Sequence, residues 1–180
     1  MTGVIDERKS LLLHVCCGPC ATQSVRRLSA DYAVTGFFSN SNVHPSEEYR
    51  RRADAARRMA ERLQMRLIED VYDHDAWLKA VHGHEAEPEG GARCALCFRF
   101  NLGRTAAVAR ERGFDLFTTT LTISPHKSSA LIFRVGRQLG PFLEMDFKKQ
   151  DGFRKSVALS REYGLYRQSY CGCEFSRTRD

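Results

Sequence analysis

Seven cysteines gathered into three short groups constrain this 180-residue chain more than any other feature of its sequence. The first group follows an apolar run near the N-terminus, the second lies mid-chain and the third stands close to the C-terminal end. The groups are Cys16, Cys17 and Cys20; Cys94 and Cys97; and Cys171 and Cys173. Cysteines that only fill a core would scatter singly. The grouping therefore predicts a fold that brings thiols together for metal or redox chemistry.

Length and composition indicate one globular domain, residues 1–180, because a domain typically takes about 150 residues. The chain is 42% hydrophobic and 28% charged, which is ordinary for a soluble protein. No apolar run approaches the ~20 residues of a membrane span. The first ten residues lack the apolar segment of a secretory signal. We therefore expect a cytoplasmic protein without membrane contact, whose cysteines form no disulfides.

Strand-like and helical segments alternate along the chain. Strands are predicted at 10–15, 33–39, 66–69, 115–120 and 141–145. Helices are predicted at 21–30, 46–65, 75–81, 93–112, 128–139 and 152–163. This order predicts an α/β fold, a mainly parallel Rossmann-like sheet flanked by helices, with a Cys-bearing C-terminal segment. Ligands of such sheets bind beyond the carboxyl ends of strands. The Cys16–Cys20 group and the segment Ser124–Lys127 should thus face one crevice.

The second and third cysteine groups together offer four thiolates to one metal centre. Cys94 and Cys97 share a face of a predicted helix, and Gly172 lets the backbone bend between Cys171 and Cys173. Four thiolates suit tetrahedral zinc or a four-iron cubane with one sulfur per iron. The C-A-L-C segment lacks the Gly and Pro of zinc knuckle turns, and a structural zinc leaves three cysteines idle. The spacing therefore favours iron–sulfur; zinc, or two core cysteines on the helix, are the alternatives.

The first group forms C-C-G-P-C at a strand-to-helix turn. A helix N-terminus stabilises thiolate, and a disulfide between adjacent cysteines is strained. Three thiolates can hold one metal ion and leave open the coordination position that a catalytic metal needs. A redox thiol pair, or small buried residues, is the alternative. The predicted metal-site segments are thus 14–20, 93–98 and 170–174.

Histidines and basic residues are weaker candidates. We interpret His14 as an interior histidine, His44 as a substrate or turn residue, and Arg50–Arg52 as a solvated helix face. His74, His82 and His84 are expected to be solvated. The formal net charge is 28 − 22 = +6, which favours a polyanionic partner. Basic residues crowd the C-terminal third and favour a nucleic acid: Lys148, Lys149, Arg154, Lys155, Arg167, Arg177 and Arg179.

Six segments in one order resemble the cobalamin-independent epoxyqueuosine reductases, the QueH family. They are LLLHVCCGPCAT, FFSNSNVHPSEEYRRR, RCALCFRF, FTTTLTISPHKS, MDFKKQDGFRKS and YGLYRQSYCGCEFS. The family's second segment usually has a proline where Ser41 stands, and some members carry an aspartate where Cys20 stands. The resemblance spans nearly the whole chain, and the C-G-C ending is its most specific part.

The resemblance implies a tRNA-modifying oxidoreductase. Its substrate would be epoxyqueuosine in the anticodon loop, reduced to queuosine by two electrons from an unidentified donor. It also implies a [4Fe-4S] cluster on Cys94, Cys97, Cys171 and Cys173, and an adjacent mononuclear iron on Cys16, Cys17 and Cys20 as the reaction centre. The proton donors that we consider are Asp146, His14, Tyr170 and water. Candidate base-stacking platforms are Phe38, Tyr49, Tyr166 and Tyr170. A zinc-stabilised, non-catalytic RNA-binding protein is the alternative function.

Overall fold

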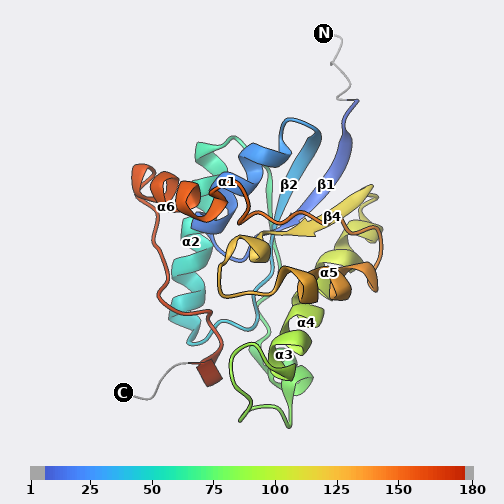
Figure 1. Ribbon diagram of the computed structural model, residues 1–180, viewed down its shortest axis with the longest axis vertical. Helices are drawn as coiled ribbons and strands as arrows, with labels where there is room; N and C mark the ends of the chain where they lie inside the picture. Colours follow the sequence, from blue (N-terminus) through green and yellow to red (C-terminus); the bar gives the residue numbers. More distant parts are fainter. Residues whose placement is uncertain (1–6, 177–180) are drawn as a thin grey trace.

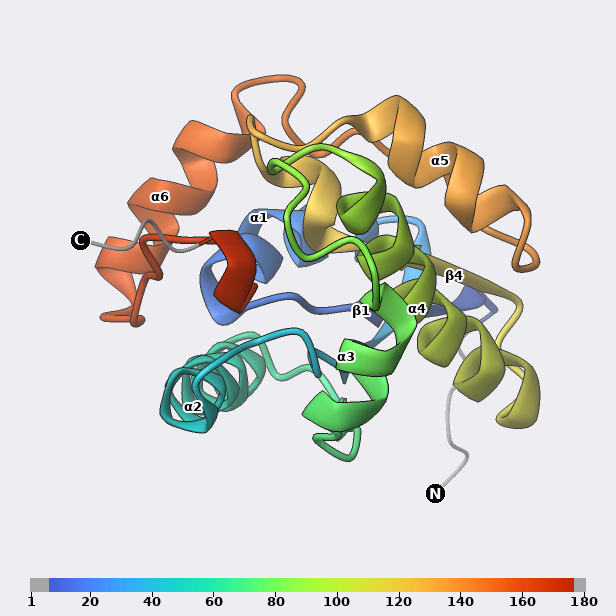
Figure 2. The ribbon, with the colours of Figure 1, turned by 90° about the horizontal axis from the view of Figure 1, so that it is seen from below.

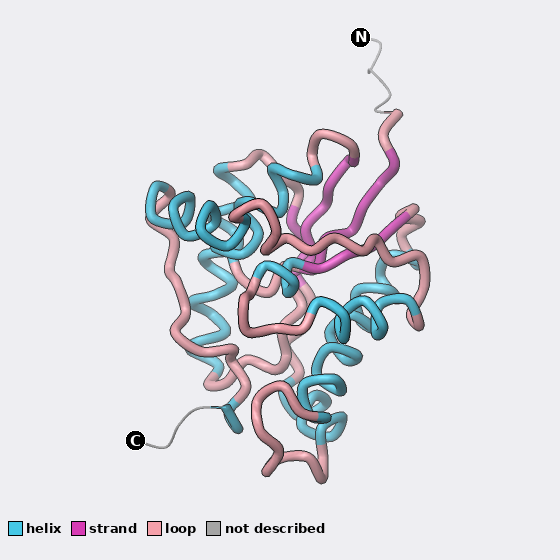
Figure 3. Tube along the Cα trace, viewed as in Figure 1, coloured by secondary structure: helices cyan, strands magenta, loops and turns pink. Residues whose placement is uncertain are grey.

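Four parallel strands form the single sheet of the computed structural model, which describes residues 7–176 (Figures 1 and 3). The strands are β1 (Lys9–His14), β2 (Tyr32–Phe38), β3 (Leu67–Glu69) and β4 (Leu116–Thr119), in the order β3-β2-β1-β4. Each neighbouring pair runs parallel. The predicted α/β fold with a parallel sheet is confirmed.

Helices cover both faces of the sheet (Figure 2). One layer holds α1 (Gly18–Leu28), α2 (Ser46–Arg62) and α6 (Gly152–Glu162). The other holds α3 (His74–Val81), α4 (Ala92–Glu111) and α5 (Ser129–Arg137). Two short 3₁₀ helices, η1 (Thr120–Ile123) and η2 (Glu174–Ser176), complete the described chain. None of the helices within 7–176 combines the length and apolar character that crossing a lipid bilayer demands.

The apolar run of β1 explains why helices pack on both sides. Leu11 and Leu13 point into the core beneath α1 and α2. Leu12 points to the other face, where it packs with Phe117 of β4 and Ala106 of α4. All three leucines are fully buried. A strand with continuous leucines must be covered on both faces, which is the usual situation of a central parallel strand.

The chain reverses its direction of travel across the sheet between β1 and β4. From β1 it proceeds outward through β2 and β3, then returns to place β4 on the opposite side of β1. The loops that follow β1 and β4 therefore diverge to opposite layers and leave a crevice between them, which is where ligands bind in such sheets. His14 and Thr119, the last residues of these strands, lie opposite each other in the register.

The strand predicted at 141–145 is not formed. The segment runs beside β4 and makes one isolated bridge, between Phe117 and Phe142. Pro141 has no N–H to donate, and the Leu143 carbonyl accepts from the hydroxyl of Thr118 rather than from a strand amide. Backbone pairing therefore does not continue into a fifth strand.

Gly18 allows α1 to touch α2 directly behind the cysteine turn. A Cβ at this position would lie 2.4 Å from the carbonyl oxygen of Ala55. We expect Gly18→Ala to lower the free energy of unfolding by about 1–3 kcal/mol, because α2 must move away. Gly103→Ala in α4, which faces open space, should raise it by about 0.5–1 kcal/mol. Anaerobic urea unfolding of the full chain measures both; equal stabilities would contradict the close helix contact.

Candidate metal centre

One pocket gathers cysteines from all three groups at the carboxyl edge of the sheet. Its cavity measures about 460 Å³. It is bounded by the turn after β1, the loop after η1, the N-terminal part of α4 and the C-terminal segment. Six thiols line it: Cys16, Cys20, Cys94, Cys97, Cys171 and Cys173. Ser124 and Lys127 line it as well, so the two loops expected to face one crevice do so.

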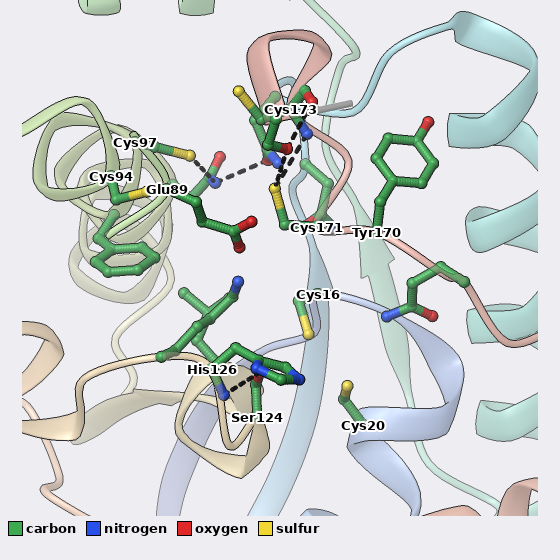
Figure 4. A pocket seen from close by; sticks show the side chains of 18 of the residues that line it. Cys16, Cys20, Glu89, Cys94, Cys97, Ser124, His126, Tyr170, Cys171 and Cys173 are labelled. Atoms are coloured by element: carbon green, nitrogen blue, oxygen red, sulfur yellow. Dashed lines mark hydrogen bonds between the residues drawn. The ribbon is translucent and has the colours of Figure 1, made fainter. Parts of the chain in front are cut away.

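The thiols fall into two sets on opposite sides of this pocket (Figure 4). The first set is Cys16, Cys17 and Cys20, whose sulfur atoms lie within 4.8 Å of one another. Cys17 is the N-cap of α1 and is buried beneath the pocket wall. Its sulfur accepts a hydrogen bond from Gln168 Nε2 at 3.0 Å, and Cys16 accepts one from Thr120 Oγ1 at 3.1 Å.

These three thiols share protons. Burial opposes a charge on Cys17, but hydrogen bonds from Cys16 and Cys20 outweigh it and bring the pKa of Cys17 well below its usual value. Donating to Cys17 raises the pKa of Cys16 to about 12, and donating to Cys16 raises the pKa of Cys20. The thiols of Cys16 and Cys20 therefore hold their protons more firmly than an isolated cysteine does. Because metal ligation requires thiolates, a bound cation releases the remaining protons, and this donor set fits one thiophilic metal ion.

The second set joins two cysteines of α4 to two of the C-terminal segment. Burial raises the pKa of Cys97 to about 12, while Cys94 accepts from the backbone N–H of Gly90 at 3.2 Å. The hydrogen bond from Cys173, together with the nearby charge of Lys127, lowers the pKa of Cys171 to about 5. The same hydrogen bond raises the pKa of Cys173.

The spacing of the second set bears on which metal group it fits. Within residues 7–176, three ligand atoms lie within 4.8 Å of one another only in Cys16/Cys17/Cys20 and in His44/His74/Glu174. A tetrahedral zinc ion, with bonds of about 2.3 Å, draws its sulfur ligands to about 3.8 Å from one another. A cubane separates its ligands more widely, because each sulfur binds a different iron at a different corner. The four sulfur atoms of the second set are therefore spaced more widely than a single tetrahedral ion requires.

Comparison with known proteins gives the family of this chain. The family model described as "Epoxyqueuosine reductase QueH" matches residues 11–179. The chain belongs to the QueH family. A relative of that name from Streptococcus pyogenes serotype M1 is 42% identical over 180 residues, which cover 94% of this chain and 71% of the relative.

Further relatives of the same name extend the match. The protein of Staphylococcus aureus is 36% identical, over 94% of this chain and 76% of its own length. The protein of Thermotoga maritima is 35% identical, over 93% of this chain and 90% of its own length. The resemblance read from the six sequence segments is therefore confirmed.

A buried arginine holds the C-terminal cysteines of this QueH-family chain in place. Arg52 is 2% exposed and bonds Glu48 Oε1 at 2.8 Å through its Nε. Its two terminal nitrogens donate to the carbonyls of Cys171 and Tyr170 at 2.9 and 3.0 Å. The interpretation of Arg50–Arg52 as a solvated face is wrong for Arg52. Its spacing of four from Glu48 was the one signal in the sequence.

The histidines divide into structural and exposed ones. His14 is fully buried, with its ring nitrogens on Thr119 Oγ1 and the Ser39 carbonyl at 2.8 and 3.0 Å, and burial lowers its pKa to about 4. It is an interior histidine, as interpreted. His74, expected to be solvated, instead contacts Ser41 O and Glu174 Oε1, both at 2.7 Å. The contact with Glu174 fastens η2 to α3.

Few of the side chains considered as proton donors or as stacking platforms for a base line the pocket. Tyr170 lines it and donates its hydroxyl to the carbonyl of His44. Asp146 pairs with Lys148 and is not among the lining residues, and His14 is enclosed. The hydroxyl proton of Tyr170 is engaged by the His44 carbonyl, so none of the three side chains considered as proton donors presents a free proton to the pocket. Phe38 is fully buried in the core and offers no stacking face.

Sequence reasoning missed two charged residues of the pocket, Glu89 and Lys127. Glu89 belongs to a polar loop between α3 and α4 that reads as solvent-exposed. Buried Arg93 ties this loop down by donating to the carbonyls of His84 and Glu85 at 3.3 and 2.8 Å. Burial disfavours a charge on Lys127, but its electrostatic interaction with the pocket thiols, that of Cys171 foremost, outweighs burial and raises the pKa of Lys127.

The arginine clamp can be tested by substitution. We expect Arg52→Met to lower the free energy of unfolding by about 3–5 kcal/mol, because Glu48 stays behind as a buried carboxylate without its ion-pair partner and keeps only the hydrogen bond from the Tyr166 hydroxyl. Hydrogen exchange at residues 170–173 should accelerate, because two carbonyls lose their donor. Arg50→Met, at an exposed position of the same helix, should change stability by no more than about 0.5 kcal/mol. Unchanged exchange in the Arg52 variant would show that the C-terminal segment is held by other contacts.

Proposed function

We propose that this chain is an iron–sulfur epoxyqueuosine reductase that converts epoxyqueuosine to queuosine in the anticodon loop of tRNA. The net reaction removes the epoxide oxygen as water, consumes two electrons and two protons, and leaves a carbon–carbon double bond. One observation supports it above all others. Thiols from three remote segments line one cavity of about 460 Å³, a volume within the ~300–1,000 Å³ typical of small-molecule sites.

The two thiol sets divide the cofactors between them in this proposal. Cys94, Cys97, Cys171 and Cys173 would hold a [4Fe-4S] cluster, and Cys16, Cys17 and Cys20 would hold an adjacent iron. When bound, these groups supply single electrons and a Lewis acid for the epoxide oxygen. The proton sharing within each set supports the assignment, because neither set reaches its fully ionised state without added positive charge.

The chain's own polar groups would orient the nucleoside. Asn101 and Gln168 line the pocket, and their side-chain oxygens are buried without a hydrogen-bond partner among residues 7–176. A buried acceptor without a donor is costly, so these two oxygens favour a ligand that brings hydroxyl or amino donors. The ring hydroxyls of a modified nucleoside supply such groups. Tyr170, held at its hydroxyl by His44, forms one wall against which a base can lie.

The basic rim of the pocket supports a tRNA substrate. Arg167 and Phe153 line the pocket, and Arg154 and Lys155, which follow Phe153 in the first turn of α6, are exposed. Lys149 is exposed three residues before the helix begins. Arg177 and Arg179 lie outside the described residues. Cations at the mouth of a pocket that accepts a flipped nucleotide would contact the flanking phosphates.

Metal analysis of cysteine variants tests the cofactor assignment. Anaerobically purified wild-type protein should be brown, with sulfide roughly stoichiometric with iron. Cys173→Ser should lose most of both, because one corner of the cluster loses its ligand. Cys17→Ala should retain most of the iron and all of the sulfide, because only the separate ion loses a ligand. A colourless protein that carries zinc would favour the zinc-stabilised, non-catalytic RNA-binding alternative.

A turnover assay tests the reaction. Reconstituted protein is incubated anaerobically with epoxyqueuosine-bearing tRNA and dithionite, and the nucleosides are analysed by mass spectrometry. We expect a product that is lighter by one oxygen atom, formed by wild type and not by Cys17→Ala. His82→Gln is the control, because His82 is exposed and does not line the pocket, so turnover should stay unchanged. Turnover by the Cys17 variant would remove the first thiol set from the reaction centre.

A further inference from the structure

We propose that Lys127 is a positive counter-charge shared by both thiol sets, and that its ammonium makes the iron–sulfur centre easier to reduce. The inference rests on the proposed function, because it concerns the group that the thiols would hold. It assigns to the loop after η1 a role in setting the reduction potential, in addition to shaping the pocket.

The backbone around Lys127 is fixed so that its side chain enters the pocket. Its N–H donates to the carbonyl of Ser124 at 3.3 Å, and its own carbonyl accepts from Lys148 Nζ at 3.2 Å. The next residue, Ser128, caps α5 by accepting from the N–H of Leu131 at 3.2 Å. In Figure 4, Ser124 and His126 of this loop lie on the pocket side facing Cys16. The side chain of Lys127 lines the pocket itself.

The other cations of the pocket are already engaged. Arg52 binds Glu48 and two carbonyls, and Arg93 binds the carbonyls of the loop before α4. Arg167 lies over the ring of Phe153, 5.3 Å from its centroid. Among residues 7–176, no hydrogen-bond or ion-pair partner is found for the ammonium of Lys127. Its charge is therefore available to the pocket.

The titratable groups that share the pocket with this ammonium come from both thiol sets. Cys171 and Cys97 belong to the second set and Cys16 to the first, and all three interact electrostatically with Lys127. Glu89 is the one carboxylate that also does so. Lys127 is therefore not the partner of a single thiolate, because it lies within electrostatic reach of both sets.

A cation in this position has a defined effect on reduction. Adding an electron to a thiolate-ligated centre adds negative charge to a partly enclosed cavity, where charges interact more strongly than in water. A nearby ammonium stabilises the reduced form more than the oxidised form and raises the potential, since net charge and hydrogen bonding set iron–sulfur potentials. Without it, the same centre would need a stronger reductant.

A redox titration of the full, cluster-loaded chain tests this. The fraction of reduced cluster is followed by electron paramagnetic resonance at controlled potentials under anaerobic conditions. Lys127→Met should lower the equilibrium constant for one-electron reduction about tenfold, which is about 59 mV toward more negative potential. Lys127→Arg, which retains the charge, should stay near the wild-type value. Iron and sulfide contents should be equal in all of these proteins.

A control and the contrary outcomes complete the test. Lys149→Met removes the same net charge from an exposed position, where solvent and salt screen it, and should leave the potential unchanged. An unmoved potential in a fully loaded Lys127→Met protein overturns the inference, as does an equal shift in the Lys149 variant. If the methionine variant does not load its cluster, Lys127→Gln takes its place with the same expectation. A wild-type protein without any reducible cluster overturns the proposed function. A reducible wild-type cluster whose potential no variant changes overturns only the inference about Lys127.

Discussion

Two carbonyl groups bound to one buried guanidinium hold the candidate site together. Arg52 reaches from α2 to Tyr170 and Cys171 and is itself anchored by Glu48. The C-terminal segment has no strand pairing and is regular only in the short helix η2, so its cysteines need such external contacts to stay opposite α4. The contact of His74 with Glu174 fastens the same segment from the other layer. The position of the second thiol set thus depends on buried polar contacts. Such contacts favour one geometry, because any arrangement that leaves a buried polar group without its partner costs free energy.

The architecture explains how so few residues bring so many thiols together. A sheet with this strand order has a crevice between the loops after β1 and β4. Cys16 and Lys127 belong to these loops, so the topology alone places both residues at the crevice. The layer of α3, α4 and α5 contributes Cys94 and Cys97 from one side. The C-terminal segment closes the remaining side after α6 has crossed to the other layer. Each contribution comes from a different part of the chain, so the site forms only when the whole domain is folded.

The sequence alone predicted the alternating order of elements, because continuous apolar strands and periodic helices leave strong local patterns. It also predicted that the cysteine groups face a common pocket, because parallel sheets direct strand ends to one edge. It did not predict that Arg52 is buried. Three consecutive arginines are typical of a solvated helix face, and the sequence pattern does not show which of them points inward. His74 was misjudged for a similar reason: its partners Ser41 and Glu174 are distant in sequence. The strand expected at 141–145 does not form. Backbone pairing depends on the strand beside it in the folded sheet, and the local sequence carries no information about that strand.

The uneven sharing of protons among the thiols has a consequence for the protein before it acquires any metal. Cys17 and Cys171 are the most acidic thiols of their sets, and each has another thiol as its neighbour. Peroxide attacks thiolates that it can reach, and the resulting sulfenic acid condenses readily with an adjacent thiol. Cys17 is buried, whereas Cys171 lines the pocket, so oxidation of the metal-free chain would begin at Cys171 and would next involve Cys173 beside it.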